Sequence, residues 1–304
     1  GRAMPERNSR QAMVIDGSQV LDNPHGTAPG LFIEHEKTSI ALLPGPPREM
    51  RPMFETLVLP RLAAKAGNLR VRRRVLRVAG LGESAVDELV APVYMQYENP
   101  QTSILFNQSE IELQLTAHGK TESDAEALLD RLSEQLEDRL GHAIFAFRGE
   151  TMEEVVGLKL TVGGYTLAVA ESCTGGLIAQ RLTEVAGASK YFIEGVIAYS
   201  NDAKTRTLGV EPMLLLEHGA VSAAVAEAMA EGVRKRANTD FGLSVTGVAG
   251  PDGGTLEKPV GLVFIALADD AHTEHRKLML PGDRHLIRWR ASQAALDLLR
   301  RRLI

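Results

Sequence analysis

Hydrophobic and polar positions in the second half of the chain alternate between two periods. From Thr151 onward, stretches with the spacing of amphipathic helices are separated by short apolar runs typical of buried strands. This order is typical of a layered α/β domain, in which active sites lie at the ends of strands. The predicted strands are 166–170, 195–199, 241–246 and 260–268, and the predicted helices are 174–187, 222–236 and 284–302.

The middle of the chain shows the same two periods on a smaller scale. Strand-like alternation at Arg72–Val78 precedes helical spacing at Glu83–Val90, and a longer helix at Glu122–Leu140 places its leucines on one face. Further strands are predicted at Ser103–Phe106, Ile111–Ala117 and Ile144–Phe147. Residues 70–148 therefore form a predicted βαββαβ unit, a small α+β domain.

The residues before this unit are predicted to form part of a third domain. Short strands at Val14–Val20, Leu31–His35 and Thr38–Leu43 are separated by Gly and Pro, and a helical stretch then reaches Ala66, with Pro60 as a kink. The fold prediction is a multi-domain α/β protein. Its predicted domains are 1–68 (partial α/β), 69–150 (α+β) and 151–304 (α/β/α layers).

Composition and charge restrict the class of protein. Of the 304 residues, 44% are hydrophobic and 24% are charged, which are ordinary globular values. The net charge of -5 argues against a general nucleic-acid binder, so the basic run Arg70–Arg74 is interpreted as a solvated strand entry, with a basic patch as the alternative. A single cysteine fits a reducing cytoplasm, and no apolar run is long enough for a membrane span. We therefore expect a cytoplasmic protein with no membrane contact.

The most informative segment is Glu171–Gly176, where an apolar run ends in small hydroxyl, thiol and glycine residues before a helical pattern. A strand would there present a nucleophile at a helix N-terminus, whose N–H groups favour an anion. The alternative is an ordinary helix cap with no chemistry. Two further polar breaks follow apolar runs, at Ala198–Lys204 and Val245–Gly254. Three such breaks in one domain predict one pocket.

The motifs of this half are Glu171–Gly176, Tyr199–Asn201 with Lys204, His218–Ser222, and Gly250–Gly254 with Lys258–Gly261. Together, over residues 152–303, they resemble the C-terminal domain of the CinA family. That family removes the amide group of nicotinamide mononucleotide. The resemblance therefore implies an amidohydrolase that converts nicotinamide mononucleotide to nicotinic acid mononucleotide and ammonia without a cofactor.

The resemblance assigns Ser172, Tyr199 and Lys204 to the catalytic group, and amide hydrolysis has a use for each. Ser172 would attack the amide carbon, Lys204 would activate it if burial or a nearby cation lowers its pKa, and Tyr199 would relay or donate a proton. Cys173 is a rival nucleophile, since a helix N-terminus lowers the pKa of a thiol. Serine is preferred because the family uses it. Without the resemblance, Lys204 would ordinarily be interpreted as a solvated surface charge and Tyr199 as a packed side chain, neither with a catalytic role.

Other residues of these motifs are expected to bind the substrate. The N–H groups at the helix start would bind the oxyanion or the phosphate, and the loop at Gly250 would offer donors to phosphate or ribose, its alternative being a simple hairpin connection. Arg284 is the candidate for a charge-assisted fork on the phosphate, with a surface salt bridge as the alternative. No His and carboxylate cluster has metal spacing, so we expect no metal here. The expected substrate-binding residues are Thr174, Gly175, Gly176, Asn201, Gly247, Ala249, Gly250 and Arg284.

The first motifs of the chain are Asn8, Gln11–Met13, Asn23–Pro24, Gly26–Gly30, Leu43–Pro47 and Glu49–Met50. They resemble the later half of the CinA N-terminal domain, which is related to molybdopterin-binding proteins and in the family is a metal-dependent pyrophosphatase acting on ADP-ribose and similar nucleotides. The earlier half, with its paired-aspartate segment, is absent before Gly1. We therefore expect pyrophosphatase activity, with its divalent metal, only of an intact domain.

The middle unit resembles the family's KH-like domain. Gly80–Glu83 departs from the GXXG loop that clamps RNA, and no aromatic stacking pair accompanies it, so we expect a spacer or dimerisation module and no nucleic-acid partner. The resemblance implies a homodimer, and the helix at 284–303 would serve the core or the interface.

Two hypotheses compete with the deamidase: a pyrophosphatase in the N-terminal part and a competence- or damage-related adaptor. A chelator separates the two enzymes, because deamidation should need no metal.

Overall fold

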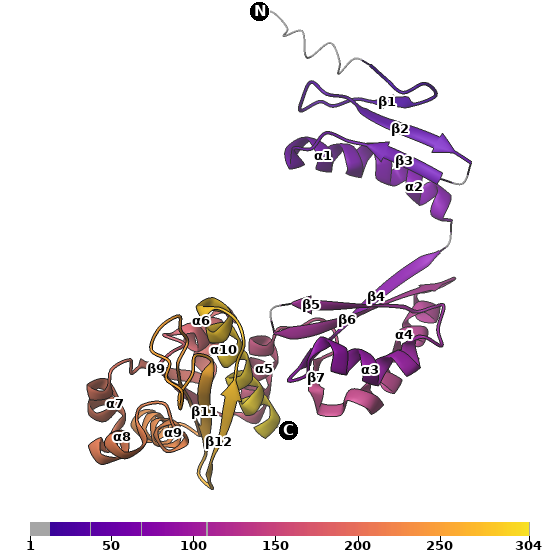
Figure 1. Cartoon of the computed structure of the whole chain (residues 1–304). Helices are drawn as coiled ribbons and strands as arrows, with labels where there is room; N and C mark the ends of the chain where they lie inside the picture. The colour runs from indigo at the N-terminus through magenta and orange to yellow at the C-terminus, as the bar shows by residue number, and fades with distance from the viewer. Residues whose placement is uncertain (1–12, 37, 68, 108, 304) are drawn as a thin grey trace, which may run out of the picture. The chain divides into compact units, whose positions relative to one another are not determined.

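The computed structural model describes residues 13–36, 38–67, 69–107 and 109–303. The chain forms two compact units, Gly1–Arg70 with Gly119–Thr121, and Val71–His118 with Glu122–Ile304 (Figure 1). The first unit is an antiparallel sheet with one interrupted helix. Its elements are β1 (Gln19–Leu21), β2 (Gly30–His35), β3 (Thr38–Leu42), α1 (Pro47–Met53), a π-helical segment (Phe54–Val58) and α2 (Leu59–Ala66).

The first predicted strand of this unit is wrong over most of its length. A turn replaces it, in which the Ser18 N–H donates to the carbonyl of Ile15 at 3.0 Å and Gly17 has a φ of 77°. Strand pairing begins only at Gln19, opposite Phe32. The interrupted helix, by contrast, covers the predicted stretch and closes over a small core that includes Phe32 and Met53.

The second unit begins with the predicted βαββαβ arrangement. Its sheet has the order β5-β6-β4-β7, and α3 and α4 pack against the apolar face of that sheet through side chains such as Leu113, Leu129 and Leu132. The elements are β4 (Arg70–Ala79), α3 (Glu83–Tyr94), β5 (Gln101–Asn107), β6 (Glu110–Gly119), α4 (Glu122–Leu140), a short 3-10 helix (Gly141–Ala143) and β7 (Ile144–Ala146).

The rest of the second unit is a five-stranded sheet in the order β12-β11-β10-β8-β9. Strand β8 lies between β10 and β9 and is parallel to both, and β11 and β12 continue the sheet antiparallel beyond β10. Its elements are α5 (Met152–Gly163), β8 (Leu167–Glu171), α6 (Leu177–Glu184), a 3-10 helix (Ala188–Lys190), β9 (Phe192–Ile197), α7 (Asn201–Leu208), α8 (Pro212–His218), α9 (Ala223–Ala237), β10 (Phe241–Gly247), β11 (Leu262–Ala268), β12 (Thr273–Met279) and α10 (Arg284–Arg302).

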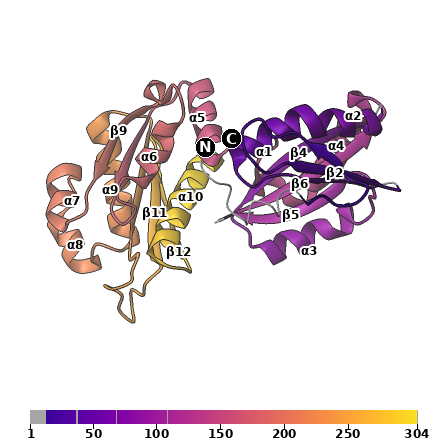
Figure 2. The same ribbon diagram turned by 90° about the horizontal axis from the view of Figure 1, so that it is seen from above.

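Helices cover both faces of this sheet, which makes the domain three layers deep. Alternate residues of β8 face opposite layers: Leu167 and Val169 pack with α5, α6 and α10, and Ala168 and Ala170 pack with α9. Figure 2 shows α9 and α10 on opposite sides of β11. The fold class predicted from the sequence, a multi-domain chain with an α/β/α domain and a small α+β domain, is confirmed.

The first helix of the α/β/α domain is terminated and fixed by local signals. Thr151 and Glu154 form a reciprocal capping box at the start of α5, and Gly164 ends the helix in the left-handed conformation. The next helix, α6, is held by Arg181, whose buried guanidinium donates to Glu153 at 2.7 Å and to Ser292 of α10 at 2.8 Å. These contacts fix the helix that follows the candidate nucleophile.

Several predicted elements differ from the structure. The helix after β8 begins at Leu177 and not at residue 174, because Gly175 and Gly176 have positive φ values of 61° and 93° and form a turn. The strand predicted at 195–199 is β9, which pairs with β8 only as far as Ile197. Sequence analysis missed α7 and α8, which are short, and β12, whose exposed polar pattern does not resemble a strand.

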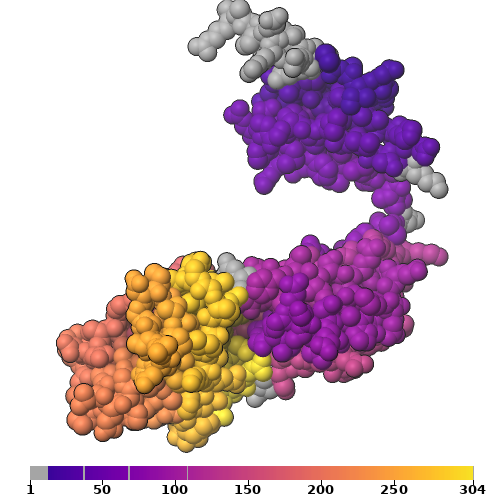
Figure 3. All heavy atoms as spheres, viewed as in Figure 1, coloured from indigo at the N-terminus to yellow at the C-terminus, as the bar shows by residue number. Residues whose placement is uncertain are grey.

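In the space-filling view, the orange and yellow atoms of the last part of the chain form one continuous surface, to which α10 and the loop around Gly250 belong (Figure 3). A hydrogen bond of 2.6 Å from Arg284 to the Gly250 carbonyl joins them. In the part of the chain that the structure describes, no helix is both long and apolar enough to cross a membrane.

Candidate active site

Three chain segments meet at the carboxyl edge of the parallel strands. Ser172 directly follows β8, and its N–H donates to the carbonyl of Val245 in β10 at 2.9 Å. On the other side of β8, the Ala198 N–H donates to the carbonyl of Glu171 at 2.8 Å. The three polar breaks therefore lie at one edge of the sheet, and their forming one pocket stays a prediction.

Lys204 of α7 reaches the side chain of Ser172 across this edge. Its Nζ lies 3.1 Å from Ser172 Oγ and donates to the carbonyl oxygen of Ala198 at 2.9 Å. Ser200 accepts the N–H of Ala203 and so begins the helix just after the strand, which places Lys204 one turn into the helix. The arrangement joins a hydroxyl nucleophile directly to an amine.

Both side chains are buried, and burial sets the protonation of the amine. Lys204 is 1% exposed and Ser172 is 8% exposed. Burial lowers the pKa of Lys204, because the ammonium form loses its hydration. The described residues give Lys204 no ion pair. The pair therefore has a property that a serine nucleophile needs, a neighbouring amine that loses its proton more readily than an exposed lysine does.

Cys173 does not have the reactive thiol that its position suggests. Its side chain is 6% exposed, and burial raises the pKa of the thiol to about 12, with the neighbouring Glu171 raising it further. The expectation that the helix start lowers this pKa is wrong, because loss of hydration outweighs any such effect. At neutral pH the group is a thiol and not a thiolate.

The helix N-terminus after Ser172 is already occupied by a carboxylate. Glu171 is 1% exposed, and its side-chain oxygens accept the N–H groups of Gly176, Ile178 and Ala179 at 3.0, 3.1 and 2.9 Å. The Gly175 N–H donates to the carbonyl of Ser172 at 3.1 Å. The N–H groups of Gly175 and Gly176 are therefore not available for an oxyanion or a phosphate, which corrects that part of the sequence prediction.

Thr174 is fully buried beside this turn. Its carbonyl accepts the guanidinium of Arg288 at 2.6 Å, and its hydroxyl is buried without a hydrogen-bond partner in the described part of the chain. Arg288 lies on α10 and is a residue that sequence analysis missed. Its position one helical turn after Arg284 was the available signal, since residues four apart share a helix face.

Tyr199, two residues after β9, contacts Arg284 at the start of α10. Tyr199 is 62% exposed, and its hydroxyl accepts Arg284 Nη2 at 3.2 Å. Arg284 also donates from Nη1 to the Gly250 carbonyl at 2.6 Å. Among the described residues, no hydrogen bond joins the Tyr199 hydroxyl to Ser172 or Lys204. The structure thus places Tyr199 with the expected phosphate ligand Arg284, and the proton-relay role of Tyr199 stays a prediction.

The remaining predicted binding residues have separate surroundings. Asn201 begins α7 and lines a surface hollow of about 630 Å³ with residues of α8. Gly247 ends β10, where an added Cβ would lie 2.7 Å from a methyl of Val263, so the position excludes larger residues for packing reasons. Ala249 is buried. Of these three, the structure gives Asn201 an exposed polar side chain and gives Gly247 and Ala249 a packing role.

Another contact fixes the loop that carries Gly250. Lys258 donates from Nζ to the carbonyl of His218 at 2.5 Å and thereby joins this loop to the end of α8. Both residues belong to motifs that the sequence analysis singled out, and their role in the structure is to hold two loops together. The last carbonyl groups of a helix have no hydrogen-bond partner within the helix, and Lys258 supplies one for the carbonyl of His218.

In the first unit, the motif residues Asn23 and Glu49 contact each other. Asn23 Nδ2 donates to Glu49 Oε2 at 2.8 Å and to the carbonyl of Ala28 at 2.8 Å, which closes the loop before β2. Asn8, Gln11 and Ala12 lie outside the described residues. Within the described ranges, no three His, Cys, Asp or Glu side chains are placed to hold a metal ion.

Fold and site together define a serine–lysine α/β/α domain joined to a small KH-like α+β domain. Models of two protein families match the chain: "CinA C-terminal domain" over residues 149–303 and "Damage-inducible protein CinA KH domain" over residues 73–146. The chain belongs to the CinA family.

Relatives match nearly the whole chain. A CinA-like protein of Koribacter versatilis is 47% identical over 305 residues, covering 99% of this chain and 74% of the relative. A putative competence-damage inducible protein of Moorella thermoacetica is 46% identical over 303 residues, covering 99% of this chain and 73% of the relative. The solved structure of competence/damage inducible protein CihA from Agrobacterium tumefaciens is 41% identical and covers 49% of this chain and 91% of its own, with a TM-score of 0.48.

Proposed function

We propose that the chain hydrolyses the carboxamide of nicotinamide mononucleotide to give nicotinic acid mononucleotide and ammonia. The observation that carries the proposal is the 3.1 Å contact between Lys204 Nζ and Ser172 Oγ, two buried side chains at the carboxyl edge of the sheet. Membership of the CinA family supports it, since the motifs of this domain resemble those of the family's deamidases.

In the proposed reaction, neutral Lys204 removes the proton of the Ser172 hydroxyl as Oγ attacks the amide carbon. The tetrahedral intermediate collapses when the C–N bond breaks, and the proton held by Lys204 leaves with the nitrogen as ammonia. A water molecule then attacks the ester on Ser172, with Lys204 again accepting the proton and returning it to Oγ. The products are the free acid and the regenerated serine.

The groups around the pair suggest how the substrate is held. Arg284 and Tyr199 contact each other and carry polar atoms for a phosphate or a ribose. The Glu171 carboxylate already fills the helix N-terminus, so the proposal places the phosphate at Arg284 and not at that helix.

The test is ammonia release from nicotinamide mononucleotide, followed with a coupled assay for the wild-type chain, Ser172→Ala and Cys173→Ala. We expect release by the wild type and by Cys173→Ala, and loss of at least about a thousandfold in kcat for Ser172→Ala. A chelator should leave the rate unchanged. Release by Ser172→Ala at the wild-type rate, or no release by the wild type, would overturn the proposal.

A further inference from the structure

Three buried polar side chains connect the KH-like α+β domain to the two helices that border Ser172. Glu110 begins β6 of the KH-like domain, whereas Gln293 and Arg181 belong to α10 and α6 of the α/β/α domain. Their exposed fractions are 6%, 3% and 2%. Burying polar and charged groups is unfavourable unless they are hydrogen-bonded, so the contacts among these three residues determine whether the arrangement is stable.

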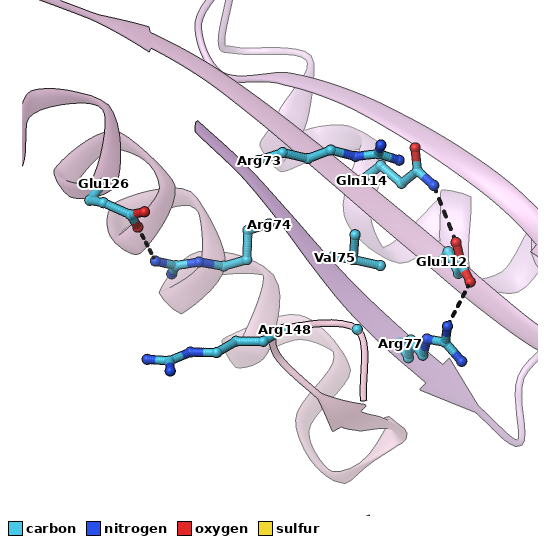
Figure 4. A pocket seen from close by; sticks show the side chains of 9 residues that line it. Arg73, Arg74, Val75, Arg77, Glu112, Gln114, Glu126 and Arg148 are labelled. Atoms are coloured by element: carbon cyan, nitrogen blue, oxygen red, sulfur yellow. Dashed lines mark hydrogen bonds and ion pairs between the residues drawn. The ribbon is translucent and has the colours of Figure 1, made fainter. Parts of the chain in front are cut away.

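Strand alternation directs Glu110 away from the core of its own domain. The next residue, Ile111, packs in that core, so Glu110 lies on the other face of the sheet. There Arg77 of β4 pairs with Glu110 and with Glu112, both at 3.2 Å, and Figure 4 shows the second of these contacts. Burial raises the pKa of the Glu110 carboxyl, and the guanidinium groups of Arg77 and Arg181 oppose this rise.

The hydrogen bonds run in one direction through the three residues. Arg181 donates from Nη2 to Gln293 Oε1 at 2.6 Å, and Gln293 donates from Nε2 to Glu110 Oε1 at 2.6 Å. A guanidinium only donates and a carboxylate only accepts, so one orientation of the Gln293 amide satisfies both neighbours and the reverse orientation satisfies neither. Glu110 therefore determines that the amide oxygen faces Arg181.

Both helices reached by this contact adjoin the turn that carries Ser172. Arg181 lies on α6, which begins at Leu177 directly after the turn. Gln293 lies on α10, five residues after Arg288, whose guanidinium donates to the carbonyl of Thr174 at 2.6 Å. A change in the packing of α6 against α10 would therefore reach the turn from two sides.

The other partners of Arg181 belong to the α/β/α domain itself. Its guanidinium donates to Glu153 of α5 at 2.7 Å and to Ser292 of α10 at 2.8 Å, and it lies 4.4 Å from the centre of the Trp289 ring. These contacts hold Arg181 in place but leave the Gln293 amide free to turn. The acceptor that fixes this amide comes from the KH-like domain.

We propose that Glu110 is a positioning residue for the serine–lysine site: through Gln293 it fixes the packing of α6 against α10, and so it holds the turn that carries Ser172. The KH-like domain is then a support of the active site and more than a spacer. The effect on the turn is independent of the reaction, and only the kinetic consequence rests on the proposed deamidase function.

Three variants of the full chain test the direction of the hydrogen bonds. In Glu110→Gln, the new amide must turn its N–H groups toward Arg77 or toward Gln293, and both of these already present N–H groups. In Gln293→Glu, two carboxylates face each other. In the double variant Glu110→Gln/Gln293→Glu the two groups are exchanged, so the carboxylate accepts from Arg181 and from the amide, whose oxygen accepts from Arg77.

The matched control is Glu112→Gln. Glu112 lies on the same strand as Glu110 and pairs with the same arginine, but its other side-chain partner is Gln114 of its own strand (Figure 4). The control thus removes one carboxylate from beside Arg77 and leaves the contact between Glu110 and Gln293 in place.

The first measurement is amide hydrogen exchange followed by mass spectrometry. We expect exchange over residues 171–184 to be about fivefold or more faster in each single variant, and to return toward the wild-type rate in the double variant and in the control. Residues 223–237 form α9 on the opposite face of the sheet and serve as the internal reference, with unchanged exchange.

The second measurement is ammonia release from nicotinamide mononucleotide. We expect kcat, corrected for the folded fraction, to fall about fivefold or more in each single variant and to recover in the double variant. KM should stay within about twofold, because Arg284 keeps its own contacts with Gly250 and Tyr199. A role limited to stability would change the folded fraction and leave this kcat unchanged.

Several results would overturn the proposal: unchanged exchange over residues 171–184 in the single variants, equally faster exchange in α9, or a double variant no better than the singles. An equal effect of Glu112→Gln would assign the change to Arg77 instead. If Gln293→Glu does not fold, Glu110→Gln against Glu112→Gln gives the same comparison. Absence of ammonia release by the wild type would refute the deamidase proposal, and the exchange pattern would still decide this one.

Discussion

The carboxylate of Glu171 accepts the N–H of Ala179 at 2.9 Å, eight residues further along the chain. The acid that directly precedes the candidate nucleophile thus occupies the N-terminus of the helix that follows it. A buried carboxylate at this place is stabilised by the helix N–H groups and in turn fixes the turn that carries Ser172.

Replacing Glu171 with Gln should lower the free energy of unfolding by about 2–4 kcal/mol, because the amide keeps one acceptor oxygen and loses the charge that strengthens three hydrogen bonds. Urea denaturation measures the loss. Glu184→Gln is the matched control, since Glu184 ends the same helix and its side chain accepts only an exposed hydrogen bond from Gln180. Equal losses in the two variants would contradict the capping role.

The pH profile of the proposed reaction should follow the titration of Lys204. Protonated lysine cannot accept the Ser172 proton, so kcat should rise with pH through the pKa of Lys204 in the folded chain and level off above it. Burial lowers this pKa from its ordinary value of 10.5, so the plateau should begin below that pH. A kcat that is flat or falls from neutral to alkaline pH, in a chain still folded by circular dichroism, would contradict Lys204 as the base.

The same pKa shift predicts a pH-dependent stability. In the unfolded chain Lys204 keeps its proton up to about pH 10.5, and in the folded chain it loses the proton at lower pH. Burial of the ammonium therefore destabilises the fold most below the folded pKa, and the penalty disappears as pH rises toward the unfolded value.

Lys204→Met removes this penalty. The variant should be inactive, yet about 1–2 kcal/mol more stable than the wild type at neutral pH, with the difference shrinking as the pH rises. Urea titrations at several pH values measure it. A variant that is less stable than the wild type by a constant amount at every pH would show that the hydrogen bonds of Lys204 outweigh its burial cost.

The Cys173 thiol should resist alkylation in the folded chain. It is buried, and its pKa of about 12 leaves almost no thiolate at neutral pH. Iodoacetamide labelling, followed by mass spectrometry, should be slow in buffer and fast in denaturant. Rapid labelling of the folded chain together with loss of ammonia release would bring Cys173 back as the nucleophile.

Gly176 should tolerate alanine less well than Gly187. Both glycines have left-handed backbones, with φ of 93° and 85°. Backbone strain should therefore lower the free energy of unfolding of both alanine variants by about 1 kcal/mol. At Gly176 the new Cβ would also lie 3.1 Å from Ile197 Cδ1, whereas nothing lies within 4 Å at Gly187. Thermal unfolding should therefore show a larger loss for Gly176→Ala, and equal losses would mean that Ile197 moves aside freely.

Sequence periodicity predicted the elements whose apolar side chains face a core. Leu167 and Val169 of β8 and the leucines of α4 are of this kind. It missed β12, because an edge strand such as Thr273–Met279 exposes most of its side chains and so lacks the apolar signal. It also placed the start of α6 too early, since Thr174–Gly176 have the composition of a helix cap but form a turn in which Gly175 and Gly176 have positive φ.

For the site, the sequence predicted the location better than the contacts. The three polar breaks lie at one edge of the sheet, because parallel strands end on the same side, while the expected single pocket stays a prediction. The sequence could place Arg288 on the same helix face as Arg284, but it could not predict the contact with Thr174 across 114 positions. The capping role of Glu171 was not predictable, because the acid precedes its helix by six residues. Such contacts depend on the tertiary packing of α6 against α10 and have no local pattern.

The hydrogen bonds from α10 to the site have a consequence for the order of assembly during translation. Arg284 holds Gly250 and Tyr199, and Arg288 holds the carbonyl of Thr174, yet α10 is synthesised more than a hundred residues after Ser172. Domains form as their segments emerge from the ribosome. The nascent chain can therefore pair β4 with β6 early, but the Ser172 turn receives its α10 contacts only when this helix has left the exit tunnel.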